Sequence, residues 1–218
     1  MYTSILDEVD IPVGKISLKG NLSIPGDANG IIIFSHGSGS SRLSSRNNLV
    51  AKFLNEKKFG TLLFDLLTLQ EDQNYNNRFD IGLLSDRLIK VTEWITKLTA
   101  AKNFQIGYFG ASTGAASALE AAAALPQITA VVSRGGRPDL AMQSLYKVKA
   151  ATLLIVGSLD LDVLQLNRKA YSQLRCEKKL EVVEGASHLF EEAGKMQIVS
   201  ALALNWFQKY LAMVKVKV

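Results

Sequence analysis

The sequence predicts one α/β domain over residues 1–218, with a mostly parallel central sheet of about eight strands and helices on both faces. Short apolar, β-branched runs recur along the chain, as in strands that are buried on both faces. Segments with helical spacing of apolar residues separate these runs. This alternation is typical of parallel strands joined by crossover helices. A length of 218 residues suits a single domain with a sizeable core.

The first elements differ from the rest of the chain. "IPVGKISLKGNLSIP" (residues 11–25) alternates apolar and polar residues, with Gly14 and Gly20 as breaks, and predicts two short antiparallel strands. "GIIIFS" (30–35) is a continuous apolar run and predicts the first buried strand. Residues 43–60 then have helical spacing and end at a glycine.

The remaining elements follow the same rules. Further strands are expected at 61–67, 105–110, 128–135, 151–157 and 179–185. Helices are expected at 81–99, 113–125, 162–174 and 193–214, with a short helix after Pro138. The polar segment 68–80 is the one long loop that the sequence predicts.

Composition excludes several classes of protein. The formal charge is +5, but the lysines are scattered and form no basic stripe, so nucleic acid is not an expected partner. No apolar run reaches the roughly 18 residues that a membrane-spanning helix needs. Cys176 is the single cysteine, which excludes an internal disulfide and fits a reducing cytoplasm. The first residues lack the basic and then apolar pattern of a secretory signal, so a cytoplasmic location is expected.

The stretch "GASTG" (110–114) carries the first chemical signal. In parallel sheets, ligands bind beyond the carboxyl ends of the strands, where this stretch lies. It fits G-x-S-x-G between a strand and a helix, which would present the Ser112 hydroxyl on a tight turn. Gly110 and Gly114 would let the strand and the helix approach closely. On pattern alone, a glycine-rich corner with an incidental serine is an equal alternative.

A base and an acid follow the serine in the required order. A serine nucleophile needs a base to take its proton and an acid to orient that base. Asp160 and His188 both follow expected strands, and the order Ser, Asp, His matches this architecture. His36 precedes Ser112 and does not satisfy the order, so we expect it to be a structural part of its loop. Asp162 is the alternative acid, at an expected helix N-cap.

Four stretches together resemble a known family: "SHGSGSS", "GYFGASTGAASAL", "LLIVGSLDLDV" and "GASHLF". They resemble the α/β-hydrolase superfamily over nearly the whole chain, and within it the small dienelactone-hydrolase-like group. The resemblance implies that Ser112 is the nucleophile, His188 the base and Asp160 the acid. It implies that the backbone N–H groups of Ser38 and Thr113 form the oxyanion hole. True dienelactone hydrolases carry a cysteine as nucleophile, so the resemblance indicates kinship and not substrate.

The expected function is therefore a serine hydrolase that cleaves a small ester, lactone or thioester through an acyl-enzyme, with no metal or organic cofactor. Two alternatives stay open: a non-catalytic binding protein of the same fold, and an acyltransferase. No long insertion follows the expected strand 128–135, where many hydrolases carry a helical cap. We therefore expect no large cap, with 68–80 as the one candidate cover. The oligomeric state is open, with a homodimer as one alternative.

Five further residues are candidates for substrate binding. Gly37 and Gly39 flank the expected oxyanion donor. Arg42 and Arg137 follow expected strands and Arg134 lies near the end of one, and a guanidinium can bind a carboxylate or phosphate through two parallel hydrogen bonds. The alternative is a structural role for these arginines, with one of them paired with Asp139.

Overall fold

A computed structural model describes residues 5–101 and 103–211. These residues form an eight-stranded sheet in the order β1-β2-β4-β3-β5-β6-β7-β8. Strands β3 to β8 are parallel, whereas β2 pairs antiparallel with both β1 and β4. The strand bounds are β1 Ile5–Val13, β2 Ile16–Ile24, β3 Ile31–Ser35, β4 Gly60–Phe64, β5 Ile106–Ala111, β6 Ile128–Arg134, β7 Ala151–Gly157 and β8 Lys178–Val183. The expected α/β architecture is confirmed.

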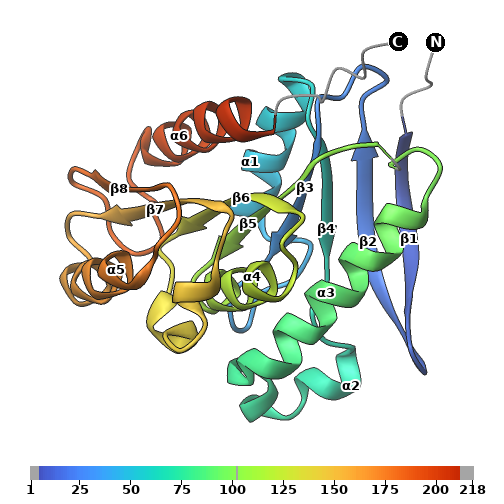
Figure 1. Ribbon diagram of the computed structural model, residues 1–218, viewed down its shortest axis with the longest axis horizontal. Helices are drawn as coiled ribbons and strands as arrows, with labels where there is room; N and C mark the ends of the chain where they lie inside the picture. Colours follow the sequence, from blue (N-terminus) through green and yellow to red (C-terminus); the bar gives the residue numbers. More distant parts are fainter. Residues whose placement is uncertain (1–4, 102, 212–218) are drawn as a thin grey trace.

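Helices cover both faces of the sheet (Figure 1). One face packs under α1 (Ser45–Glu56) and α6 (Lys195–Tyr210). The other packs under α3 (Ile81–Lys97), α4 (Thr113–Ala124) and α5 (Leu161–Gln173). Because the central strands are covered on both sides, all residues of β3, β4, β5 and β7 are buried. None of the described helices combines the length and the apolar character that crossing a bilayer requires.

The N-terminal hairpin is longer than the sequence predicts. Its two nine-residue strands pair from Ile5 to Ile24 and turn at Gly14, which has a φ of 61°. Gly20 does not break the second strand. It lies within β2, where a Cβ atom would stand 3.0 Å from the Cδ1 atom of Ile11. Neighbouring apolar side chains fill the space that Gly20 leaves, which a local pattern does not reveal.

The segment 68–80 is not a plain loop. It holds the short helix α2 (Leu69–Asp72) and the 3₁₀ helix η1 (Tyr75–Phe79). Thr68 and Glu71 form a reciprocal capping box at the start of α2. The described residues contain no large cap. After β6, the expected short helix is present as η2 (Pro138–Ala141), followed by η3 (Leu145–Lys147). The expected last helix, 193–214, extends beyond the described residues.

Candidate active site

Ser112 occupies the turn between β5 and α4, with φ 52° and ψ −121°. This region of φ is strained for a residue with a side chain, at a cost of about 1–3 kcal/mol. Neighbouring backbone holds the turn in place. The N–H of Ser112 donates to the Arg134 carbonyl at 3.2 Å, and its own carbonyl accepts from the N–H groups of Ala115 and Arg137. The residue is partly exposed at the carboxyl edge of the sheet.

Glycines let the chain pass close to this turn. A Cβ atom on Gly110 would stand 2.5 Å from the Cα atom of Ala115, and one on Gly114 would collide with the Ser35 carbonyl. A Cβ on Gly37 would stand 3.1 Å from the Cβ atom of Ser112. The loop after β3 therefore packs directly against the turn that carries Ser112.

Asp160 and His188 are joined by a short hydrogen bond. The distance between His188 Nδ1 and Asp160 Oδ2 is 2.6 Å. Asp160 stands at the N-cap position of α5, but its side chain bonds His188 instead of capping the helix. Asp162 lies exposed in the first turn of α5. Helix α5 thus begins one residue earlier than the sequence predicts, and Asp160, not Asp162, takes the N-cap position.

The His188 ring lies beside the Ser112 turn. A Cβ atom on Gly135, which has a φ of 51°, would stand 3.6 Å from His188 Cε1. Gly135 directly follows Arg134, whose carbonyl accepts from the Ser112 N–H. No hydrogen bond joins the Ser112 hydroxyl to His188 within the described part of the chain. Such contacts are often long without substrate and tighten when substrate binds.

The loops that follow β7 and β8 hold each other. The N–H of Leu159 donates to the Ala186 carbonyl at 3.0 Å, and the N–H of Gly185 donates to Ser158 Oγ at 2.8 Å. These bonds fix Asp160 and His188 relative to one another, because each lies within three residues of a bonded position.

The N–H of Ser38 has an acceptor in this structure. It donates to the Thr113 hydroxyl at 2.8 Å, and Thr113 itself is buried. The N–H of Thr113 belongs to the first turn of α4, where backbone donors have no partner inside the helix. The bond therefore connects the two residues expected to form the oxyanion hole.

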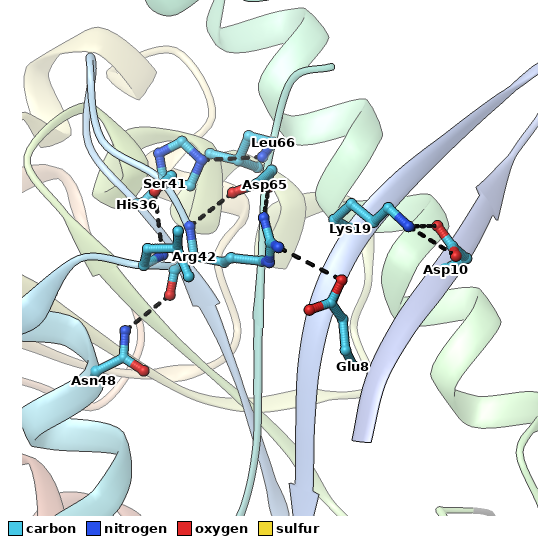
Figure 2. Close-up of polar contacts among 10 residues, drawn as sticks. Glu8, Asp10, Lys19, His36, Ser41, Arg42, Asn48, Asp65 and Leu66 are labelled. Carbon is cyan, nitrogen blue, oxygen red and sulfur yellow. Dashed lines mark hydrogen bonds and ion pairs between the residues drawn. The ribbon is translucent and has the colours of Figure 1, made fainter. Parts of the chain in front are cut away.

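Both ring nitrogens of His36 bond to backbone groups. Figure 2 shows the His36 ring beside Leu66, whose N–H donates to Nε2 at 3.0 Å. Since Nε2 accepts, the hydrogen is on Nδ1, which donates to the Gly37 carbonyl at 2.9 Å. Burial lowers the pKa of His36. Its position is the structural one that the sequence predicts.

Arg42 bonds acidic side chains of the protein. Its backbone N–H and its Nη1 atom donate to the two carboxylate oxygens of Asp65, at 2.8 and 2.7 Å (Figure 2). A longer ion pair of 3.7 Å joins Arg42 Nη2 to Glu8. The carbonyl of Arg42 accepts from Asn48 Nδ2 at 2.8 Å. The Arg42 guanidinium thus tightens the loop after β3 against β4.

A cavity of about 690 Å³ lies beside this ion pair, between the β1–β2 hairpin and the loops after β3 and β4. His36, Ser41 and Asp65 line it, whereas Ser112 and His188 do not. Next to it, the segment 68–80 reaches the loop after β3. A Cβ atom on Gly39, which has a φ of 67°, would stand 3.7 Å from Arg78 Nη1. The segment 68–80 thus contacts the loop that carries the expected oxyanion donor.

The two remaining arginines differ in their side-chain partners. Arg137 forms a two-pronged pair with Asp139, at 2.9 and 2.8 Å, and this contact raises the pKa of Arg137. Arg137 therefore has the acidic partner that the structural alternative expects. Arg134 is buried, and the one hydrogen bond of its side chain in the described chain joins Nη2 to Asn47 Oδ1 at 3.5 Å.

Two residues that brace the loops of the site were not predicted from the sequence. Asn167 is fully buried and donates to the Gly136 carbonyl at 2.9 Å, which braces the turn after β6. Glu192 accepts from the Ser187 N–H at 3.0 Å, which braces the loop of His188. Asn167 had a local signal, because it interrupts the apolar face between Leu164 and Ala170. Glu192 had none, since its partner is set by the loop conformation.

Comparison with solved structures agrees with this fold. A dienelactone hydrolase from Anabaena variabilis ATCC 29413 is 50% identical, with a TM-score of 0.93 over 95% of this chain and 99% of that one. Est1E from Butyrivibrio proteoclasticus is 16% identical, with a TM-score of 0.80 over 93% of this chain and 98% of that one, which is a likeness of fold alone.

Curated relatives are longer than this chain. Two Mycobacterium tuberculosis proteins, from strains CDC 1551 / Oshkosh and ATCC 25618 / H37Rv, are 50% identical over 206 residues and carry the provisional name phosphoribosyl transferase. The match covers 94% of this chain but 46% of each relative, so the chain spans about half their length. No family model matches the sequence. The shared fold and the 50% identity over almost the full length of the Anabaena structure show that the chain belongs to the dienelactone hydrolase-like group of the α/β-hydrolase superfamily.

Proposed function

We propose that this chain is a serine hydrolase that cleaves an ester, lactone or thioester of a small substrate through an acyl-enzyme. The observation that carries the proposal is the 2.6 Å bond between Asp160 and His188, beside the strained turn of Ser112. Strain on the nucleophile and a carboxylate on one nitrogen of the base are the arrangement that serine catalysis uses.

In the proposed mechanism, the Ser112 hydroxyl attacks the acyl carbonyl while His188 Nε2 accepts its proton. Asp160 holds the hydrogen on Nδ1 and stabilises the imidazolium that forms. His188 then gives the proton to the leaving group. A water molecule, activated by the same nitrogen, hydrolyses the acyl-enzyme and releases Ser112. The side chain of His188 is 37% exposed and that of Asp160 is 14% exposed, so the base is open to substrate while its acid is shielded.

For the oxyanion hole we propose the N–H groups of Thr113 and Ser38. The Thr113 N–H stands at the positive end of the α4 dipole, which favours a developing negative charge. The Ser38 N–H would exchange the Thr113 hydroxyl for the oxyanion when substrate binds. Loss of one such donor typically costs about 10²–10³ in rate.

The name of the Mycobacterium relatives belongs to proteins about twice as long. This chain matches 99% of a solved dienelactone hydrolase, so we assign hydrolysis to the shared part and phosphoribosyl transfer, if those relatives perform it, to their remaining part. On this proposal, the present chain releases no pyrophosphate from phosphoribosyl pyrophosphate with any acceptor.

Active-site labelling tests the proposal. A fluorophosphonate probe should label the folded protein, and Ser112→Ala should abolish labelling. Ser172→Ala, at an exposed serine of α5, is the matched control and should be labelled like the wild type. Hydrolysis of p-nitrophenyl esters of increasing chain length, beside a lactone and a thioester, would give the substrate class. A competing alcohol in the same assay separates transfer from hydrolysis. Equal labelling of Ser112→Ala would overturn the proposal.

A further inference from the structure

Arg134 is a buried cation without an acidic partner. It is the last residue of β6 and is 6% exposed. Its side chain lies on the same side of the strand as Ala130 and Val132, which pack under α1 and α6. The bond to Asn47 is long, and the Nε atom is buried with no hydrogen-bond partner in the described chain. No carboxylate of the described residues lies within ion-pair distance of it.

The surroundings of Arg134 add positive charge. Burial, and then the nearby charge of Arg46, lower the pKa of Arg134 to about 10, so it remains a cation at neutral pH. Arg46 is in the first turn of α1, and its own Nε atom is buried without a partner. This turn contains no acidic residue, and the positive end of the helix dipole lies here. Among the described residues, the one acidic side chain paired with either arginine is the exposed Glu191, which bonds Arg46 at 2.9 Å.

A buried charge is stable only where another charge or a full set of hydrogen bonds compensates it. A helix N-terminus attracts an anion through its dipole and its free backbone donors. At the start of α1 the Asn47 N–H already donates to Ser44 Oγ, and the buried Arg134 guanidinium bonds the Asn47 side chain. We propose that Arg134 and Arg46, beside the N-terminus of α1, form a binding site for a small inorganic anion, chloride or phosphate, behind the Ser112 turn.

The site lies outside the proposed acyl-binding site but touches both of its loops. The carbonyl of Arg134 holds the Ser112 N–H, and the side chain of Arg46 holds Glu191, three residues beyond His188. A bound anion would therefore fix the Ser112 turn and the His188 loop together. Anion binding does not require the proposed hydrolase activity; only an effect of the anion on turnover rests on it.

Thermal unfolding at constant ionic strength tests the site. Sodium chloride or sodium phosphate would replace the sodium salt of a bulky sulfonate. At saturation, at least one of the two anions should raise the Tm of the wild type by about 4–8 °C relative to the sulfonate. Arg134→Met should lose this rise. Arg168→Met, which removes the same charge from the exposed side of α5, should keep it. A rise that persists in Arg134→Met, or no rise in the wild type, would overturn the proposal.

A direct measurement covers the case in which Arg134→Met does not fold. Crystals of the wild type grown in sodium bromide should show an anomalous peak beside Arg134 Nε. In Arg46→Gln, the anion concentration that gives half of the Tm rise should increase by at least about tenfold. Bromide only at other surface sites would overturn the site. Both measurements are independent of fluorophosphonate labelling, so failure of the anion site and failure of the proposed activity can be told apart.

Discussion

The two histidines of this chain follow different strands at the same edge of the sheet and have different surroundings. His36 follows β3, and both of its ring nitrogens bond to backbone groups. His188 follows β8, its Nδ1 atom bonds a carboxylate, and its Nε2 atom has no partner among the described residues. On the proposed function, this contrast shows what a catalytic base requires. One nitrogen must be oriented by a charge, and the other must be free to exchange a proton.

Burial and charge act in opposite directions on His36. Asp65 lies close enough to favour its protonated form, as does the bond to the Gly37 carbonyl. Desolvation outweighs both and lowers the pKa of the ring. Protonation would also remove the acceptor of the Leu66 N–H. The ring of His36 is therefore kept neutral and serves as a structural connector between two loops.

The largest expected effect is the loss of activity when His188 is replaced. His188→Ala should lower kcat for ester hydrolysis by about 10⁴–10⁶, because no other group can take the Ser112 proton. Its Tm should stay within about 2 °C of the wild type, since the ring is partly exposed. Steady-state kinetics and calorimetry measure both. Comparable activity in His188→Ala would show that the contrast between the histidines is wrong.

A second prediction concerns the carboxylate on His188. Asp160→Asn should lower kcat by about 10²–10⁴, because the amide can stabilise the wrong tautomer of the ring. Asp162→Asn is the matched control and should remain within about twofold of the wild type, since Asp162 is exposed and does not bond the ring. If Asp162→Asn is the more damaged of the two, the acid is misassigned.

Removing the bond between Ser38 and Thr113 should have a smaller effect on kcat. Thr113→Val removes the acceptor of the Ser38 N–H while keeping the shape of the side chain. We expect kcat to fall by about 3–10-fold, the effect of one ordinary hydrogen bond, because in the free enzyme this bond holds the Ser38 loop in place before its N–H passes to the oxyanion. Thr113→Ser should restore the rate, because the hydroxyl returns. A Thr113→Val enzyme of full activity would mean that the bond does not position the oxyanion donor.

The smallest effect concerns stability and its dependence on pH. His36→Leu leaves the Leu66 N–H unpaired, which should cost about 1–3 kcal/mol of unfolding free energy at pH 7.5. Since folding lowers the pKa of His36, the unfolded state takes up a proton first as pH falls below about 6.5. The wild type should then lose unfolding free energy, whereas the variant has no ring at this position to protonate. Urea unfolding between pH 7.5 and 5 should therefore show that the difference in unfolding free energy between the two proteins becomes smaller as pH falls. A constant or growing difference would contradict this.

Local sequence patterns were enough to predict most elements and their order. Apolar runs and helical spacing are local patterns, so the buried strands and the amphipathic helices could be predicted within a few residues. The turn of Ser112 was also predictable, because a G-x-S-x-G stretch between a strand and a helix permits little else. Even α2 had a local signal, since Thr68 and Glu71 stand at capping-box spacing.

Which polar groups meet depends on how distant segments pack together. The side chain of Asp160 leaves its helix cap for His188, 28 residues away along the chain, and Arg42 meets Asp65 at a separation of 23. The N–H of Ser38 reaches the hydroxyl of Thr113, and Arg134 is left without an acid. Sequence patterns report the periodicity of one element, whereas these partners come from different loops. Their distances and burial are fixed by the packing of the sheet that brings the loops together.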